Sequence, residues 1–282
     1  MEVKKFYRDY YDRISDKRWN SPFPLRRYIH RANYSQLIHH IQTYLPSGGR
    51  LLDAGCGDGL LTWLIAGEFG EVEIFGADIS GPNIDAAIQR QHQTTKLKNL
   101  HYLISDAEKF PFADSSFDLV ISSHVLEHLP SFETGLHEIW RLSKDHAIIA
   151  LPTCLNACAM VLLGGDDFWK FSPRSPFAFW FGLLRVLSHM GKEGVNEGYA
   201  GHEELPHLWR YPWKMRRSIR QAGFSIEHFE AQSLCIPYLG SLSPSIFLRL
   251  QIILDRLQAK PFFKEFGYGS LAVVNKFPQD NT

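Results

Sequence analysis

Several features that mark whole classes of protein are missing from this sequence of 282 residues. Neither sign of charge is in excess, because 30 Lys and Arg residues balance 30 Asp and Glu residues, so no nucleic-acid partner is indicated. The four cysteines show no paired metal-ligand spacing and indicate reduced thiols. No apolar run is long enough to span a membrane, and no charged-then-apolar leader opens the chain. We therefore expect a cytoplasmic protein.

Glycine, by contrast, is concentrated where a ligand would need it. Residues 50–59 form a short apolar run that holds Asp53 and then places glycines at alternate positions from Gly55 to Gly59. Such a turn lets backbone approach a small molecule at the carboxyl end of a parallel strand. The dinucleotide pattern G-x-G-x-x-G is not met, since Thr62 stands where its third glycine would fall. The spacing therefore favours a nucleoside cofactor other than NAD.

Acidic residues follow the next two strand-like runs. The run 72–77 ends at Asp78, about 20 residues past the glycine turn, which is the offset of a carboxylate that accepts from ribose hydroxyls. The run 100–104 is followed by Asp106. Another acid, Asp118, precedes a strand-like run, so we interpret it as a structural turn residue.

Periodicity predicts strands that alternate with helices, and hence an α/β fold with a doubly wound, mostly parallel sheet. We expect helices over 2–18, 31–45, 59–68, 81–93 and 131–143, and later strands over 146–151, 224–230 and 270–274. The chain is interpreted as one domain over 1–282, with a core of 31–152 and 212–276. Two insertions interrupt it, at 153–211 and 233–267.

The order of these motifs over residues 50–151 resembles the class I methyltransferases that use S-adenosylmethionine (SAM), in the small-molecule group with a type 11-like domain. The resemblance rests on Leu52–Gly59, Ala77–Ser80, Asp106–Phe112 and Ser116–Leu129. It implies a Rossmann-like, seven-stranded sheet with one antiparallel strand, SAM as cofactor and S-adenosylhomocysteine (SAH) as product.

The resemblance also implies a role for each cofactor residue. The methionine end would lie along the backbone of Gly55 and Gly57, with Asp53 holding that turn. The ribose, the adenine and the sulfonium would meet the residues that follow the next three strands: Asp78 for the ribose, Ile79, Asp106 and Ala107 for the adenine, and Ser123 and His124 for the sulfonium.

Both insertions leave two interpretations open. Residues 153–211 are rich in large apolar side chains, which either bury against the sheet edge as a cap or cover a hydrophobic acceptor as a lid. Residues 243–266 alternate apolar and basic groups, which indicates either a packed amphipathic helix or peripheral contact with a membrane.

A hydroxyl acceptor would need a base, and histidine suits that role near neutral pH. We rank His207 and His202 of the first insertion before His124. We expect no metal; the alternative is a metal held by His124, Glu127 and His128. That cluster resembles the Glu-x-x-Glu-His segment of quinone-biosynthesis O-methyltransferases, with His124 in place of the first Glu.

The sequence thus predicts SAM-dependent methyl transfer to a small or lipid-like hydrophobic acceptor. Oxygen is the favoured acceptor atom, with carbon and nitrogen as alternatives. The competing hypothesis is a SAM-binding subunit without chemistry that serves a partner; the intact glycine turn and the three acids favour the enzyme.

Overall fold

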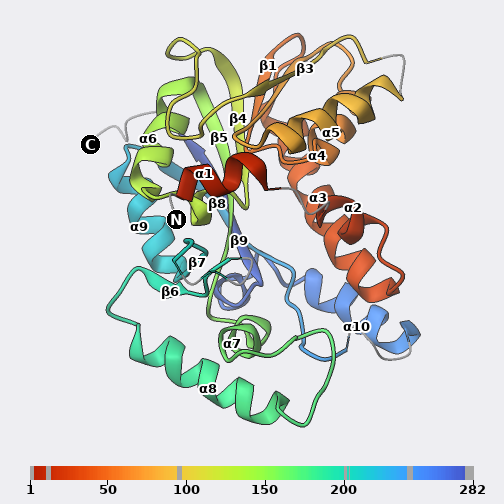
Figure 1. The fold of residues 1–282 in the computed structure, drawn as a ribbon, viewed down its shortest axis with the longest axis vertical. Helices are drawn as coiled ribbons and strands as arrows, with labels where there is room; N and C mark the ends of the chain where they lie inside the picture. Colours follow the sequence, from red (N-terminus) through yellow and green to blue (C-terminus); the bar gives the residue numbers. More distant parts are fainter. Residues whose placement is uncertain are drawn as a thin grey trace.

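The computed structural model describes residues 3–10, 14–93, 97–199, 202, 204–239 and 244–276. Its centre is a seven-stranded sheet with the order β3-β2-β1-β4-β5-β9-β8 (Figure 1). Only β9 runs against the other strands, pairing antiparallel with both β5 and β8. The fold class is therefore confirmed. The strands are β1 (Arg50–Ala54), β2 (Glu73–Asp78), β3 (Leu100–Ile104), β4 (Phe117–Ser123), β5 (Ser143–Pro152), β8 (Ser225–Gln232) and β9 (Gly269–Asn275).

Helices cover both faces of this sheet (Figure 1). On one face α3 (Pro24–Tyr44) and α4 (Leu60–Glu68) bury Leu37, Ile41 and Ile65 against the strands, with α5 (Gly81–His92) beside them. On the other face α6 (Phe132–Leu142) and α9 (Pro212–Gln221) bury apolar side chains such as Leu136 and Ile219. Because β1 and β4 are covered on both faces, consecutive residues of each strand are buried instead of alternate ones.

The amino-terminal helices differ from the sequence-based expectation. The single helix expected over 2–18 is two short ones, α1 (Val3–Asp9) and α2 (Ile14–Trp19), and residues 11–13 lie outside the described part of the chain. The helix expected over 31–45 begins earlier, at Pro24. Proline suits the first turn of a helix, where its missing N–H is not needed, and no helix breaker follows it before Arg31. The longer α3 brings His30 and Asn33 to the carboxyl ends of the strands.

The glycine turn after β1 requires glycine for two separate reasons. Gly55, Gly57 and Gly59 all have positive φ, at 90°, 54° and 70°, a region that other residues rarely adopt. In addition, a Cβ on Gly55 would overlap the side chain of Val125, whereas a Cβ on Gly57 would meet nothing within 4 Å. The turn is thus packed on one side and open on the other.

The first insertion folds as α7 (Ala157–Leu163), α8 (Ser175–Ser188) and the hairpin β6 (Gly194–Asn196) and β7 (Leu208–Arg210). The two helices cross at glycines: a Cβ on Gly164 would overlap the backbone of Ala178, and one on Gly182 would overlap Met160. The second insertion carries α10 (Pro244–Asp255), which packs against α3. The division of the chain into core and insertions stays a prediction.

None of the described helices is both long and apolar enough to cross a bilayer.

Substituting Gly182 by Ala should push α8 away from α7 and lower the free energy of unfolding by about 1–3 kcal/mol, as overpacking does. Gly191→Ala is the matched control, because a Cβ there would meet nothing within 4 Å. Urea unfolding measures both variants. Equal stability of the two would contradict the close crossing of α7 and α8.

Candidate functional site

A cavity of about 300 Å³ opens at the carboxyl ends of β1, β2 and β4. All of the residues that the sequence assigned to the cofactor line it, so the structure brings them together. They are Asp53, Gly55, Gly57, Asp78, Ile79, Asp106, Ala107, Ser123 and His124.

Asp78 clamps the glycine turn to the end of β2. Its carboxylate accepts hydrogen bonds from the backbone N–H of Gly57 at 2.9 Å and of Ser80 at 2.8 Å. Burial raises the pKa of Asp78 above its usual value, and these two bonds oppose that shift by favouring the charged form. A carboxylate with oxygens on the cavity wall and lone pairs to spare can accept from ribose hydroxyls.

Asp53 lies deeper, beneath the same turn. Its Oδ2 accepts a 2.7 Å hydrogen bond from the Thr62 hydroxyl, and burial raises the pKa of Asp53 to about 7. The residue that breaks the dinucleotide pattern, Thr62, therefore holds the acid inside the motif. This position suits the expected role of Asp53 in supporting the turn.

Asp106 is bound to a residue that sequence reasoning missed. Lys4 Nζ lies 2.6 Å from Asp106 and 2.5 Å from Glu108, so α1 is tied to the loop after β3. Drawn in red near the centre of Figure 1, α1 lies across this end of the sheet. No local signal could have indicated the pair, because 102 positions separate Lys4 from Asp106.

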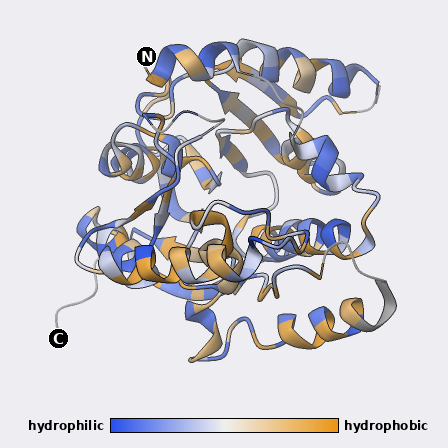
Figure 2. Ribbon diagram, turned by 60° about the horizontal axis from the view of Figure 1, so that its bottom comes forward, coloured by the Kyte–Doolittle hydropathy of each residue, from blue (hydrophilic) through white to orange (hydrophobic). Residues whose placement is uncertain are grey.

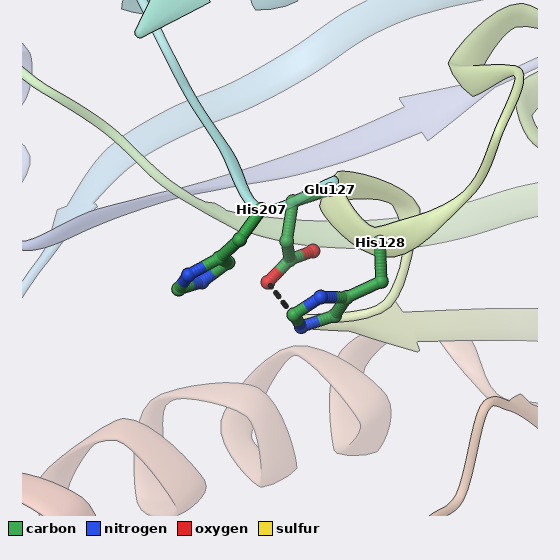
Figure 3. A group of neighbouring side chains, drawn as sticks. All are labelled: Glu127, His128 and His207. Carbon is green, nitrogen blue, oxygen red and sulfur yellow. Dashed lines mark ion pairs between the residues drawn. The ribbon is translucent and has the colours of Figure 1, made fainter. Parts of the chain in front are cut away.

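At the other end of the cavity a buried carboxylate is surrounded by histidines. Glu127, 2% exposed, has its Oε1 3.4 Å from His124 Nδ1 and 3.9 Å from His128 Nε2. The His207 ring stacks on the His128 ring, with centroids 4.8 Å apart and planes 12° apart. Figure 3 shows His207 reaching this group from a different segment than Glu127 and His128. Among the described residues, Glu127 Oε2 has no hydrogen-bond partner.

The charges in this cluster are set by burial and by the neighbouring rings. Burial acts to raise the pKa of Glu127, but the hydrogen bond with His124 and the charges of His128 and His207 lower it overall. Burial lowers the pKa of His128 to about 4. At neutral pH the site therefore presents a carboxylate to a neutral His128 ring.

The carboxylate of Glu197 orients the His207 ring. Its Nδ1 lies 3.0 Å from the carboxylate of Glu197, which also accepts a 2.7 Å hydrogen bond from Trp209 Nε1. Because Nδ1 faces Glu197, Nε2 is the ring nitrogen left to act in the cavity that His207 lines. A carboxylate that holds one imidazole nitrogen fixes the tautomer and supports a positive charge on the ring.

The other two candidate bases, His124 and His202, differ in their position relative to the cavity. His124 lines the cavity and has φ of 58°, a left-handed conformation that costs a residue with a side chain about 1 kcal/mol and is common at functional sites. The described residues that line the cavity do not include His202. Its side chain is 45% exposed, its ring centroid lies 5.6 Å from that of Phe6, and it pairs with Glu204.

A second residue of α1 reaches the histidine cluster. The Tyr7 hydroxyl lies 3.0 Å from His128 Nδ1, and burial raises the pKa of Tyr7 above its usual value. α1 therefore contacts both ends of the cavity, through Lys4 and Tyr7. The aromatic spacing of this segment predicted a helix, but nothing in it indicated a contact with residue 128.

Glu127, His128 and His207 could also hold a metal, since one ligand atom from each lies within 4.8 Å of the others. This group differs from the sequence-based alternative, which had His124 in place of His207. Two imidazoles and a carboxylate suit several transition metals.

Asp118 has a structural role, as expected, but it lies within β4 rather than in a turn before that strand. Its carboxylate accepts from the Arg50 N–H at 2.8 Å and from Lys144 Nζ at 2.7 Å. It joins the starts of β1 and β4 at the end of the sheet opposite the cavity.

Comparisons with known proteins agree with this geometry. A family model described as a methyltransferase domain matches residues 52–151. The chain is 29% identical to demethylmenaquinone methyltransferase of Lactiplantibacillus plantarum, over 67% of this chain and 76% of that protein. It is 31% identical to ubiquinone biosynthesis O-methyltransferase of Sinorhizobium fredii, over 45% of this chain and 51% of that protein. The fold is similar to that of magnesium protoporphyrin IX methyltransferase from Synechocystis with bound SAH, at a TM-score of 0.58, 14% identity, and coverage of 98% of this chain and 100% of that one.

Asp78→Asn should weaken SAH binding by about 10- to 100-fold, because a hydrogen bond to a charged group contributes about 1.5–3 kcal/mol. Asp118→Asn is the matched control, since Asp118 lies at the opposite end of the sheet. Titration calorimetry gives both affinities. Unchanged SAH affinity in Asp78→Asn, or tighter binding of NAD than of SAH by the wild type, would overturn the assignment of this cavity.

Proposed function

Since the chain belongs to the class I SAM-dependent methyltransferases, an enzyme family whose methyl donor is SAM, we propose that it methylates a hydroxyl oxygen of a small or lipid-like hydrophobic acceptor. The single observation that carries this proposal is that one cavity joins the cofactor acids to an oriented histidine. Asp78 and Asp106 line one part of the cavity and His207 lines another. Two relatives named for quinone biosynthesis support a hydrophobic acceptor.

The residues of the cavity fit SAM. The open face of Gly57 would leave room for the methionine part against the backbone of the turn, and Asp78 and Asp106 have the acceptor oxygens that a nucleoside needs. When bound, SAM supplies a methyl group that its sulfonium already activates for transfer. The protein must then exclude water, align the acceptor and remove its proton.

Aromatic side chains form the wall around the histidine cluster. Tyr199 contacts the rings of both His128 and His207, with centroids 4.5 Å and 5.5 Å away, and Trp209 lies 5.7 Å from His207. Tyr268 lines the same cavity and lies 5.4 Å from Trp209. Such a wall favours a flat or hydrophobic acceptor and keeps water away from the methyl transfer.

Within this wall His207 is the proposed base. Its Nε2 would accept the proton of the acceptor hydroxyl while Glu197 holds Nδ1. The carboxylates of Glu197 and Glu127 would stabilise the imidazolium that forms. His124 is the second candidate, since it also lines the cavity and contacts Glu127.

A metal at Glu127, His128 and His207 is the alternative mechanism for the same reaction. A bound cation would lower the pKa of the acceptor hydroxyl, so that water could take up its proton and no side-chain base would be needed. Cytoplasmic location and peripheral membrane contact stay predictions.

His207→Gln should lower kcat by about 10²–10⁴, the usual contribution of a general base, and leave SAH affinity nearly unchanged. His202→Gln is the comparison, because its ring lies outside the cavity lining and its loss should leave kcat near that of the wild type. The assay follows SAH release with hydroxylated quinones and alkylated phenols as acceptors. Equal rates for His207→Gln and the wild type would exclude His207 as the base.

Chelation separates the two mechanisms. With His207 as base, dialysis against EDTA should leave turnover unchanged. If activity is lost and then restored by a divalent cation, the metal mechanism holds instead.

A further inference from the structure

One face of α8 consists of large apolar side chains that point away from the protein. Residues three or four apart share a face of a helix, and here the shared face is outward. The exposed fractions are 69% for Phe177, 62% for Trp180, 67% for Phe181, 62% for Leu184 and 52% for Leu187. Phe171 before the helix (65%) and Met190 after it (47%) extend the apolar surface at both ends. We call these seven residues the α8 face.

The opposite side of α8 fixes this orientation. Ala178, Gly182 and Val186 are buried, and the glycine crossing with α7 leaves no room for α8 to roll. The Tyr211 hydroxyl donates to the Val186 carbonyl, and the Tyr238 hydroxyl donates to the Ser175 carbonyl at 3.1 Å. The side chains of the α8 face are therefore neither buried on the sheet nor part of the cavity wall, and both of the sequence-based interpretations are wrong for these seven residues, whereas Tyr199 and Trp209 of the same insertion do line the cavity.

The segment that carries the α8 face has basic residues and no acidic ones. From Lys170 to Lys192 the sequence has Arg174 and Arg185 and no carboxylate, although the whole chain has equal numbers of acids and bases. All four residues are exposed, but the Arg185 guanidinium donates to the carbonyls of Leu163 and Asn196, which leaves Lys170, Arg174 and Lys192 as the cations beside the α8 face. Of the neighbouring acids, Asp166 accepts from the hydroxyls of Ser172 and Ser175, and Glu193 pairs with Arg210 and Lys214. Asp167 accepts from its own loop at the Trp169 N–H.

Aromatic and leucine side chains with cations before and after them in the sequence are the composition of a helix that lies in the surface of an anionic bilayer. Tryptophan and phenylalanine settle at the level of the headgroups, and lysine and arginine contact the phosphates. We propose that the α8 face docks the protein on an anionic lipid surface. Figure 2 brings the side of the protein that carries α8 forward, and the helices on that side are coloured largely as hydrophobic.

The docked side connects to the cavity through a continuous apolar layer. Phe171 contacts Tyr238 at 5.4 Å, and the buried Phe168 lies 5.4 Å from Tyr268, which lines the cavity. Phe168 and Tyr238 belong to the same apolar cluster as Tyr268. The α8 face and the wall of the cavity thus belong to one packed unit, so docking would hold the cavity close to a bilayer that contains a lipid-like acceptor. This part of the inference rests on the proposed function, whereas docking does not.

The experiment is sedimentation of the full chain with vesicles of phosphatidylcholine alone or mixed with phosphatidylglycerol. The wild type should bind the anionic vesicles and release them at high salt. The double variant Trp180→Ser/Phe181→Ser should bind roughly tenfold more weakly, and Lys170→Glu/Arg174→Glu should lose the preference for anionic lipid. Ile104→Ser is the matched control, an apolar side chain equally exposed (62%) at the end of β3, and should bind as the wild type does.

SAH affinity shows that the variants are folded, because none of the substituted residues lines the cavity. Wild-type protein that stays in solution with every vesicle, or a double variant that binds like the wild type, would overturn the docking proposal. A second result would also overturn it: sedimentation equilibrium that shows the wild type as a dimer and the double variant as a monomer. The α8 face would then be covered by a second copy. Binding to vesicles without methylation of any lipid-like acceptor would overturn the acceptor class and leave docking intact.

Discussion

The structure depends on how the end of β1 is fastened to the end of β2. The N–H groups of Gly55 and Cys56 both donate to the Ala77 carbonyl, at 2.7 and 2.9 Å, and Gly57 N–H donates to Asp78. These bonds hold three residues with positive φ in one shape and leave the outer side of Gly57 open. Packing of Gly55 on Val125 then places the next segment, which carries the histidine cluster, beside the turn. A cofactor site and a reaction site can therefore share one cavity.

The cofactor half could be predicted from sequence because its signals are local. Each acid lies at or just beyond the end of a strand-like run, and parallel strands bring their carboxyl ends to one edge, so Asp53, Asp78 and Asp106 had to meet. The reaction half could not be predicted in the same way. Tyr7 and His128 are 121 positions apart, and the His128–His207 stack depends on how the first insertion folds back. His202 and His207 looked equivalent in sequence, and each has a carboxylate partner, but of the two His207 lines the cavity and His202 does not.

The first insertion shows a different limit of sequence reasoning. Its hydrophobicity was evident, and apolar stripes are usually buried, so burial or a lid was the natural expectation. The direction of the stripe is decided instead by Gly164 and Gly182, which let α7 and α8 approach closely and turn the side of α8 that carries Ala178, Gly182 and Val186 inward. The large side chains are left outside. The available signal in the sequence was the pair of glycines, Gly164 and Gly182. It predicts the direction of the apolar stripe only when the crossing of α7 and α8 is already known.

The central claim is that one cavity holds the nucleoside at Asp78 and Asp106 and presents the methyl-donor sulfur to the cluster around Glu127. A crystal structure of the protein with SAH tests it most directly. We predict ribose hydroxyls at Asp78, adenine beside Ile79 and Asp106, and the sulfur on the side of His124 and His207. SAH bound with its sulfur turned away from Glu127, or bound outside the cavity, would contradict the account.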